Sequence, residues 1–206
     1  MKLEPLFFLI MLVLYLLHNL FLTIYFKRKF KKDDYFIGEK APSELQKFFG
    51  KSFYLIIIYY ILILVYLFTG FDFWGLISNI SIVNTPVFKI SGFLVGIIFI
   101  ILMTAARLNL GSSWRVGLDP NTEDKLVTTG FYRFIRNPYF TFLLCFQFSL
   151  ILIIPNAITI FAFIQSYILI NLQIREEEGF LRKKYGESYI SYKNSTGRFF
   201  PKNTLR

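Results

Sequence analysis

The sequence predicts an all-α integral membrane protein with about five membrane-spanning helices, and three observations lead to this prediction. Of the 206 residues, 55% are hydrophobic and 20% are aromatic, a composition too apolar for a soluble domain of this size. The apolar residues form five runs, each long enough to cross most or all of a hydrocarbon core of roughly 30 Å. Lys and Arg residues are concentrated in alternate segments between these runs.

The predicted spans, in chain order, are residues 5–26, 53–69, 90–106, 139–154 and 157–173. The first run is longer than the apolar region of a signal peptide and no A-x-A cleavage pattern follows it, so we interpret it as a retained helix. It contains His18 and Asn19, a polar pair that we expect to hydrogen-bond to a neighbouring helix. Gly92 and Gly96 in the third span form a GxxxG pattern, which favours close helix packing within the monomer.

The connections between the spans differ in character. Residues 71–89 are too polar and too interrupted for another span, and we place them outside as an interfacial or re-entrant segment. Residues 107–137 are long for a connection and contain apolar side chains that can pack, which favours an ordered, functional loop. Pro138 begins the fourth span, where the missing N–H of proline costs nothing, and Pro155-Asn156 turns the chain into the fifth.

The placement of the basic residues predicts the topology. Eight Lys or Arg residues fall between residues 27 and 51, five between 107 and 136, and eight from 175 to 206; the remaining two are Lys2 and Lys89. Five spans put the three rich segments on one side of the membrane, so the positive-inside tendency predicts a cytoplasmic site and an amino terminus outside. The net charge of +10 then reflects topology and attraction to anionic membrane lipids. No motif of a nucleic-acid-binding fold accompanies it, and we expect no nucleic-acid partner.

Cys145 is the only cysteine and His18 is the only histidine. An internal disulfide and a cysteine-based zinc cluster are therefore impossible, and we expect no metal site. Cys145 lies in an apolar predicted helix, where packing is its expected role.

Helical periodicity continues beyond the fifth span, through residues 175–192. Apolar and aromatic side chains, among them Leu181 and Tyr189, fall near one face, which predicts an amphipathic interfacial helix. Glu178 lies four residues before Arg182, the favourable orientation for an ion pair on a helix surface. One interpretation of the acidic run REEE is therefore that it forms solvated ion pairs on the helix surface and has no catalytic or binding role.

The combination of charges favours a functional interpretation. Glu176 and Glu177 follow the helical hairpin directly, and the hairpin returns them to the membrane face that carries Arg136 and Tyr132. A zwitterionic, amino-acid-like ligand needs a carboxylate for its ammonium group and an Arg or Lys for its carboxylate. A sulfonium cation is also favoured by aromatic faces; the candidates are Tyr132, Tyr139 and Phe140.

These residues carry a resemblance. The pattern LVTTGFYRFIRNPYF, followed by REEEGFLRKKYGESYISYKNSTGRFFP, resembles the isoprenylcysteine carboxyl methyltransferase family and the related membrane phospholipid methyltransferases. The resemblance is concentrated in residues 124–201 and implies one methyltransferase domain over residues 1–206, with its catalytic motifs in 107–201. It implies S-adenosylmethionine as the methyl donor at the cytoplasmic face and a lipophilic substrate, such as a prenylated molecule or a lipid, received from the bilayer.

The resemblance also implies the roles of individual residues. Together with the charged residues considered above, the predicted cofactor-binding set is Asp124, Lys125, Leu126, Val127, Gly130, Tyr132, Arg136, Asn137, Pro138, Tyr139, Phe140 and Glu176. Glu177 is the predicted catalytic residue, and it forms the substrate-binding set with Gln173 and Arg175. Three residues depart from the family pattern, since Asn137 replaces a His, Phe140 replaces a Tyr, and Gln173 replaces an Arg near the substrate carboxylate.

A carboxylate acceptor needs little acid–base chemistry, because it is already ionised near neutral pH. The protein would then act by orientation, with Glu177 fixing the reacting groups. A protonated amine or a thiol would need a base, for which Glu177 is the first candidate.

Two other functions remain open. The R-x-P and YG-x-x-Y elements also resemble membrane sterol reductases, which use a nicotinamide cofactor, although the tandem glutamates after Arg175 fit the methyltransferases better. A non-catalytic lipid-binding membrane protein is the third possibility, but it leaves the co-occurrence of both motifs unexplained.

Overall fold

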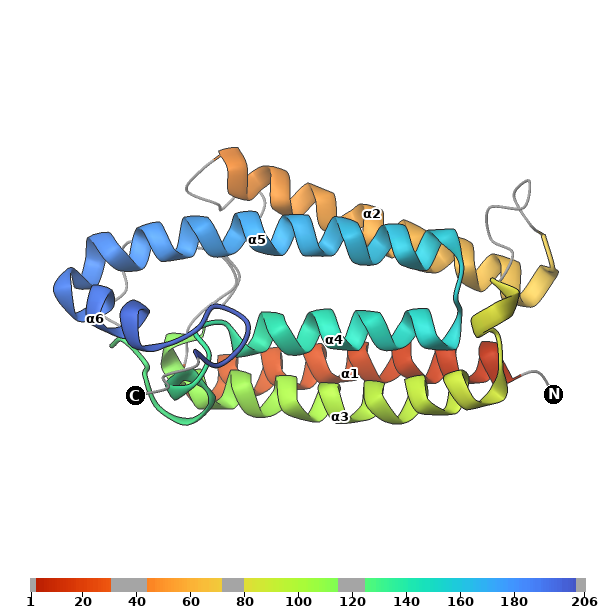
Figure 1. The fold of residues 1–206 in the computed structure, drawn as a ribbon, viewed down its shortest axis with the longest axis horizontal. Helices are drawn as coiled ribbons and strands as arrows, with labels where there is room; N and C mark the ends of the chain where they lie inside the picture. The colour runs from red at the N-terminus through yellow and green to blue at the C-terminus, as the bar shows by residue number, and fades with distance from the viewer. Residues whose placement is uncertain (1–2, 31–43, 72–79, 115–124, 203–206) are drawn as a thin grey trace.

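The computed structural model describes residues 3–30, 44–71, 80–114 and 125–202 (Figure 1). These residues form the α-helices α1 (Leu3–Phe30), α2 (Glu44–Thr69), α3 (Pro86–Leu110), α4 (Pro138–Ile153), α5 (Ala157–Tyr185) and α6 (Glu187–Ser195). Short 3₁₀ turns lie between them: η3 (Ser81–Val83), η4 (Gly111–Ser113) and η5 (Gly130–Arg133).

The helices confirm the predicted class of all-α integral membrane protein. Among the described residues, four helical stretches are long and apolar enough to cross a membrane: Leu3–Phe30, Gly50–Thr69, Pro86–Ser113 and Ala157–Tyr185. The fourth predicted span is α4, which is apolar but has only 16 residues. It is short because Pro138 starts it and the turn at Pro155 and Asn156 follows it, where the Asn156 side chain caps the first turn of α5.

The helices are arranged in two groups, with α2 lying along α5 on one side and α1, α3 and α4 together on the other (Figure 1). The closest pair is α3 with α4, and two glycines explain the approach. A Cβ atom on Gly92 would lie 2.7 Å from the Ser149 carbonyl oxygen, and one on Gly96 would lie 2.7 Å from the Ser149 hydroxyl and the Met11 sulfur. The GxxxG pattern therefore packs within the monomer, as predicted.

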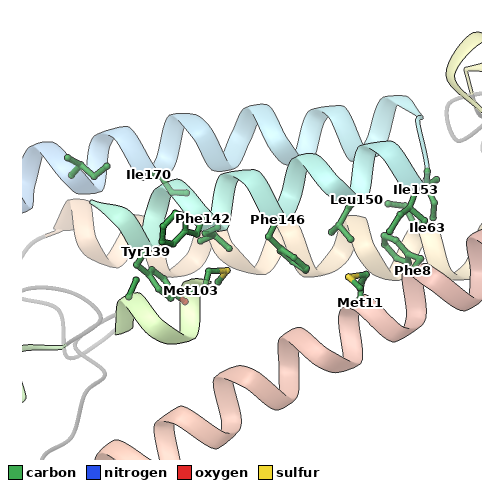
Figure 2. Packing of buried hydrophobic residues seen from close by; sticks show 14 residues of the cluster. Phe8, Met11, Ile63, Met103, Tyr139, Phe142, Phe146, Leu150, Ile153 and Ile170 are labelled. Carbon is green, nitrogen blue, oxygen red and sulfur yellow. The ribbon is translucent and has the colours of Figure 1, made fainter. Parts of the chain in front are cut away.

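The interior between the helices is filled by aliphatic and aromatic side chains (Figure 2). Phe146 and Leu150 of α4 are each 1% exposed, and Met11 of α1 and Met103 of α3 are fully buried in the same cluster. Lipid-facing positions on α1, such as Leu16 and Phe21, are more than half exposed. This separation of a packed interior from an apolar exterior is what a bundle in hydrocarbon requires.

Polar contacts join α1 to α3 at two levels. The His18 Nδ1 atom lies 2.8 Å from the Thr104 hydroxyl, which confirms the predicted interhelical hydrogen bond for His18. Asn19 instead donates to the Tyr15 carbonyl of its own helix. Near the amino-terminal end, the Lys89 ammonium lies 2.5 Å from the Glu4 carboxylate, and both side chains are about nine-tenths buried.

The predicted helix over 175–192 is wrong at one point. The helix breaks at Gly186, which has φ +52° and ψ −128°, so α5 ends at Tyr185 and α6 begins at Glu187. Only glycine adopts this backbone conformation without strain, and nothing lies within 4 Å of a Cβ added there. The break turns α6 back toward the end of the bundle (Figure 1).

Within the predicted interfacial segment 71–89, residues 72–79 lie outside the described part of the chain. The Ile80 N–H donates to the Pro155 carbonyl at 2.7 Å, which fixes the start of η3 to the turn between α4 and α5. The third helix begins at Pro86 rather than near residue 90, because proline is well suited to a first helical position.

Candidate functional site

A pocket is lined by residues of α5, α6, the 3₁₀ turns η4 and η5 and the chain beside these turns. These elements lie together at one end of the bundle (Figure 1). The pocket combines charged, aromatic and aliphatic side chains. Seven of its lining residues belong to the predicted site: Lys125, Leu126, Val127, Tyr132, Arg136, Asn137 and Glu177. Six others were not predicted as site residues: Leu110, Ser113, Phe180, Leu181, Tyr185 and Tyr192.

One wall of the pocket is a single stripe of α5. Glu177, Leu181 and Tyr185 are spaced four residues apart, so they share one face of the helix, and Phe180 lies beside them. The Glu177 carboxylate accepts a hydrogen bond from the Gln173 side-chain amide at 2.9 Å, one turn earlier. Gln173 therefore orients Glu177 but does not itself line the pocket.

The opposite wall is held by η4 and η5. The Ser113 hydroxyl donates to the Lys125 carbonyl at 3.2 Å, and the Asn109 side-chain oxygen accepts from the Phe131 N–H at 2.9 Å. Gly130 precedes this bond with φ +60°, and a Cβ added there would lie 1.8 Å from the Asn109 oxygen. The role of Gly130 is thus to let the loop approach α3 closely, because a side chain there would have a strained positive φ and would displace the Asn109 side chain.

Two buried tyrosines, Tyr132 and Tyr192, line the pocket. Tyr132 is buried, and its carbonyl accepts a hydrogen bond from the Tyr192 hydroxyl at 2.7 Å. Burial, with a smaller contribution from the Glu177 carboxylate, raises the pKa of Tyr132 well above its ordinary value. Burial raises the pKa of Tyr192 to about 12, although Arg136 and Thr196 oppose the shift. Both hydroxyls are protonated at neutral pH, and that of Tyr192 donates to the Tyr132 carbonyl.

Glu178 is not the solvated partner of Arg182 that the sequence suggested. It is 7% exposed and contacts three cations: Arg136 at 3.2 Å, Lys193 at 3.0 Å and Arg198 at 2.9 Å. We call these four residues the Glu178 cluster. The prediction failed because α6 and the chain after it fold back over α5, which a helix-surface argument does not include.

The Glu178 cluster fastens the carboxyl-terminal segment Thr196 to Lys202 beside the pocket. Ile135 forms a parallel bridge with Gly197, and the Arg136 N–H donates to the Gly197 carbonyl at 2.8 Å. The Asn137 side-chain amide donates to the Arg198 carbonyl at 3.2 Å. Asn137, which stands where the family pattern has a His, thus contacts the protein's own backbone as well as the pocket.

An aromatic and cationic stack lies behind the wall formed by η4. The Trp114 ring meets the Tyr139 ring edge to face, with 4.6 Å between centroids. The Arg107 guanidinium carbon lies 4.6 Å from the Trp114 centroid and 5.2 Å from the Phe26 centroid. Tyr139 is thereby buried in packing contacts rather than placed along the pocket.

The structure does not bring every predicted residue to the pocket. Those that do not line it are Gly130, Pro138, Tyr139, Phe140, Gln173, Arg175 and Glu176. Arg175 is exposed on α5, and Glu176 is half-buried. Asp124 lies outside the described residues. Within the described ranges, no group of three His, Cys, Asp or Glu side chains is positioned to hold a metal ion.

The sequence carried a signal for some of the residues that were missed. Leu181, Tyr185 and Tyr192 fall on the apolar face of the amphipathic pattern over 175–192, which was interpreted as a membrane-interface face. Leu110 and Ser113 had no comparable signal, because they reach the pocket through the turn that η4 makes after α3.

The charged and aromatic side chains that line the pocket fit a zwitterionic ligand. Glu177 supplies a carboxylate, Lys125 and Arg136 supply positive charge, and the rings of Phe180 and Tyr185 border the same space. These are the groups that an ammonium, a carboxylate and a sulfonium would require.

Comparison with known families finds a match over the part of the chain that contains most of the pocket's lining residues. The family model described as phospholipid methyltransferase matches residues 87–188, which run from the start of α3 into α6. The matched region includes every lining residue except Tyr192. A comparison with curated protein sequences finds no match.

Proposed function

Because the chain belongs to the phospholipid methyltransferase family, we propose that it transfers a methyl group from S-adenosylmethionine to a lipophilic acceptor at the cytoplasmic membrane face. The family makes the protein a membrane methyltransferase that acts on lipid-like substrates. The proposal adds the methyl donor, the class of acceptor and the residues that act.

The single observation that carries the proposal is the pocket's combination of one carboxylate, two cations and aromatic rings. Arg136 and Lys125 would attract the carboxylate of the methyl donor's amino-acid portion, and Glu177 would attract its ammonium or the nearby sulfonium. When bound, S-adenosylmethionine supplies an electrophilic methyl group on a positively charged sulfur. The aliphatic side chains of Leu126, Val127 and Leu181 would exclude water from the reacting centre.

The acceptor that requires least from these residues is a carboxylate, as in a prenylated cysteine. It is ionised near neutral pH, so the protein contributes orientation rather than proton transfer. Glu177, held by Gln173, has one role in this reaction, which is to fix the position of the positively charged donor. Arg175 is exposed on the same helix and is available to steer an anionic acceptor toward the site.

Isothermal calorimetry on the protein in nanodiscs tests the proposal. We expect saturable binding of S-adenosylmethionine and of its demethylated product, and weaker binding of both by Lys125→Met. Lys202→Met is the matched control, because Lys202 is exposed and lies outside the pocket. Binding of reduced nicotinamide cofactor, with no response to either methionine-derived ligand, would assign the protein to the reductases instead. Mass spectrometry of membrane extract incubated with isotopically labelled donor then identifies the acceptor.

A further inference from the structure

We propose that Glu178 is a positioning residue of the site: it holds Arg136, which lines the pocket, and it holds the carboxyl-terminal segment against Arg136 and Asn137. The inference rests on the proposed function for its ligand, but its structural part stands independently. Glu178 itself does not line the pocket.

The tandem glutamates face different neighbours. Successive residues of an α-helix are separated by about 100° of rotation, so adjacent side chains cannot share one face. Glu177 lines the pocket, whereas Glu178 points to the other three members of the Glu178 cluster. The two adjacent glutamates therefore have different roles. Glu177 is placed to contact the ligand, and Glu178 holds the residues beside the pocket.

The hydrogen bonds of Arg136 show why this support matters. A guanidinium has five N–H groups. The Nε and Nη2 atoms of Arg136 donate to Glu178 at 3.3 and 3.2 Å, and Nη1 donates to the carbonyls of Lys193 and Thr196. Four of the five N–H groups are thereby directed at the protein itself, which leaves at most one for a ligand. Arg136 contributes chiefly its charge and its position to the pocket.

Glu178 is the acidic member of a cluster assembled from three parts of the chain. Arg136 precedes α4, Lys193 lies on α6 and Arg198 lies on the carboxyl-terminal segment. Arg136 and Glu178 have side chains only 10% and 8% exposed, so each needs the other's charge. Removing the carboxylate leaves the positive charge of Arg136 buried without this partner and releases Arg198. The bonds from Arg136 and Asn137 to residues 197 and 198 would then weaken.

The first test compares Glu178→Gln with Glu187→Gln, an exposed glutamate of α6, in nanodiscs. In Glu178→Gln we expect amide hydrogen exchange at residues 135–137 and 196–200 to accelerate about tenfold or more, the effect expected from losing a charged hydrogen bond. Exchange in α3 should not change. We expect the dissociation constant of S-adenosylhomocysteine to rise about tenfold in the folded protein. Glu178→Asp keeps the charge and should recover most of that affinity, whereas Glu187→Gln should match the wild type.

The outcomes separate a positioning role from a merely stabilising one. A stabilising role predicts that Glu178→Gln lowers the melting temperature but binds the ligand normally, and that result would overturn the inference. Unchanged exchange in both segments would overturn it as well. If Glu178→Gln does not fold, Arg198→Gln is tested in its place, since Glu178 keeps two cations there; normal exchange and normal affinity in that variant contradict the inference. If the wild type binds no methionine-derived ligand, the proposed function fails, and the exchange comparison still decides whether Glu178 holds the segment.

Discussion

Glu177 and Glu178 are neighbours in the chain, yet their surroundings assign them different tasks. Glu177 is held by Gln173 at the pocket, and Glu178 is enclosed by three cations. The two residues have the same side chain, so amino-acid type alone predicts the same effect for substituting either. Their different contacts in the structure predict different effects.

Substituting Glu177→Gln keeps the size of the side chain and removes its charge. We expect methyl transfer to fall by at least about a hundredfold, because the carboxylate no longer stabilises and orients the positively charged donor. The melting temperature should stay close to that of the wild type. The measurement is turnover of isotopically labelled S-adenosylmethionine with the acceptor identified by mass spectrometry. Glu187→Gln, which makes the same chemical change on an exposed face of α6, serves as the control. Near-normal turnover in Glu177→Gln would place the reacting centre elsewhere.

Gly130 offers a second prediction at the scale of a single residue. Gly130→Ala must adopt a positive φ, which costs about 1–2 kcal/mol, and its Cβ displaces the Asn109 oxygen that accepts the Phe131 N–H. We expect a loss of about 2 kcal/mol or more in stability. Thermal unfolding in detergent measures it.

Gly179→Ala is the matched control for this change. Gly179 lies within α5 and nothing is within 4 Å of an added Cβ, so alanine should be neutral or stabilising by up to about 1 kcal/mol. Equal melting temperatures for the two variants would show that the loop conformation at Gly130 does not depend on glycine.

At the scale of elements, the contact between α3 and α4 depends on small side chains. An alanine at Gly92 would place its Cβ 2.7 Å from the Ser149 carbonyl oxygen and 2.8 Å from the Leu152 Cβ, both on α4. The two helices must separate to accept it, and such overpacking costs about 1–3 kcal/mol. We expect Gly92→Ala to lower the melting temperature, as circular dichroism would measure.

Ser91→Ala, on the exposed side of the same turn, should change the stability by less than about 0.5 kcal/mol. If Gly92→Ala is as stable as Ser91→Ala, then close packing through the GxxxG pattern does not hold α3 against α4.

At the scale of the whole molecule, the elements that line the pocket lie at one end of the bundle, and η3 lies at the other (Figure 1). The distribution of basic residues predicts that the pocket end is cytoplasmic and the amino terminus is outside. After Cys145 is replaced by alanine, single cysteines at Ser195 and Ile82 report the two ends, since both positions are exposed. A membrane-impermeant thiol reagent applied from outside should label the cysteine at position 82 and leave that at 195 unlabelled. The reverse pattern would contradict the predicted orientation.

The class of the protein and the end of the bundle that carries the candidate pocket could be predicted from the sequence, because hydrophobicity, span length and turn residues act locally. The apolar runs lie in α1 to α5, although α4 has only 16 residues and is shorter than the four helices that are long enough to cross a membrane. The two motifs on either side of the helical hairpin meet in one pocket because the hairpin turns at Pro155 and Asn156. Seven of the predicted residues line that pocket for the same reason.

The tertiary structure decided what each polar side chain contacts. Glu178 meets Arg136, which is 42 residues away, because the hairpin of α4 and α5 returns the chain to the same end of the bundle. It meets Lys193 and Arg198 because the helix breaks at Gly186 and the chain after α6 returns beside α5. Two adjacent glutamates are alike in the sequence, but only one of them is buried among cations. An ionised group removed from water needs an opposite charge beside it, so burial determines the contacts of each. Glu178 finds three such partners, and Glu177, one residue earlier, is left facing the pocket.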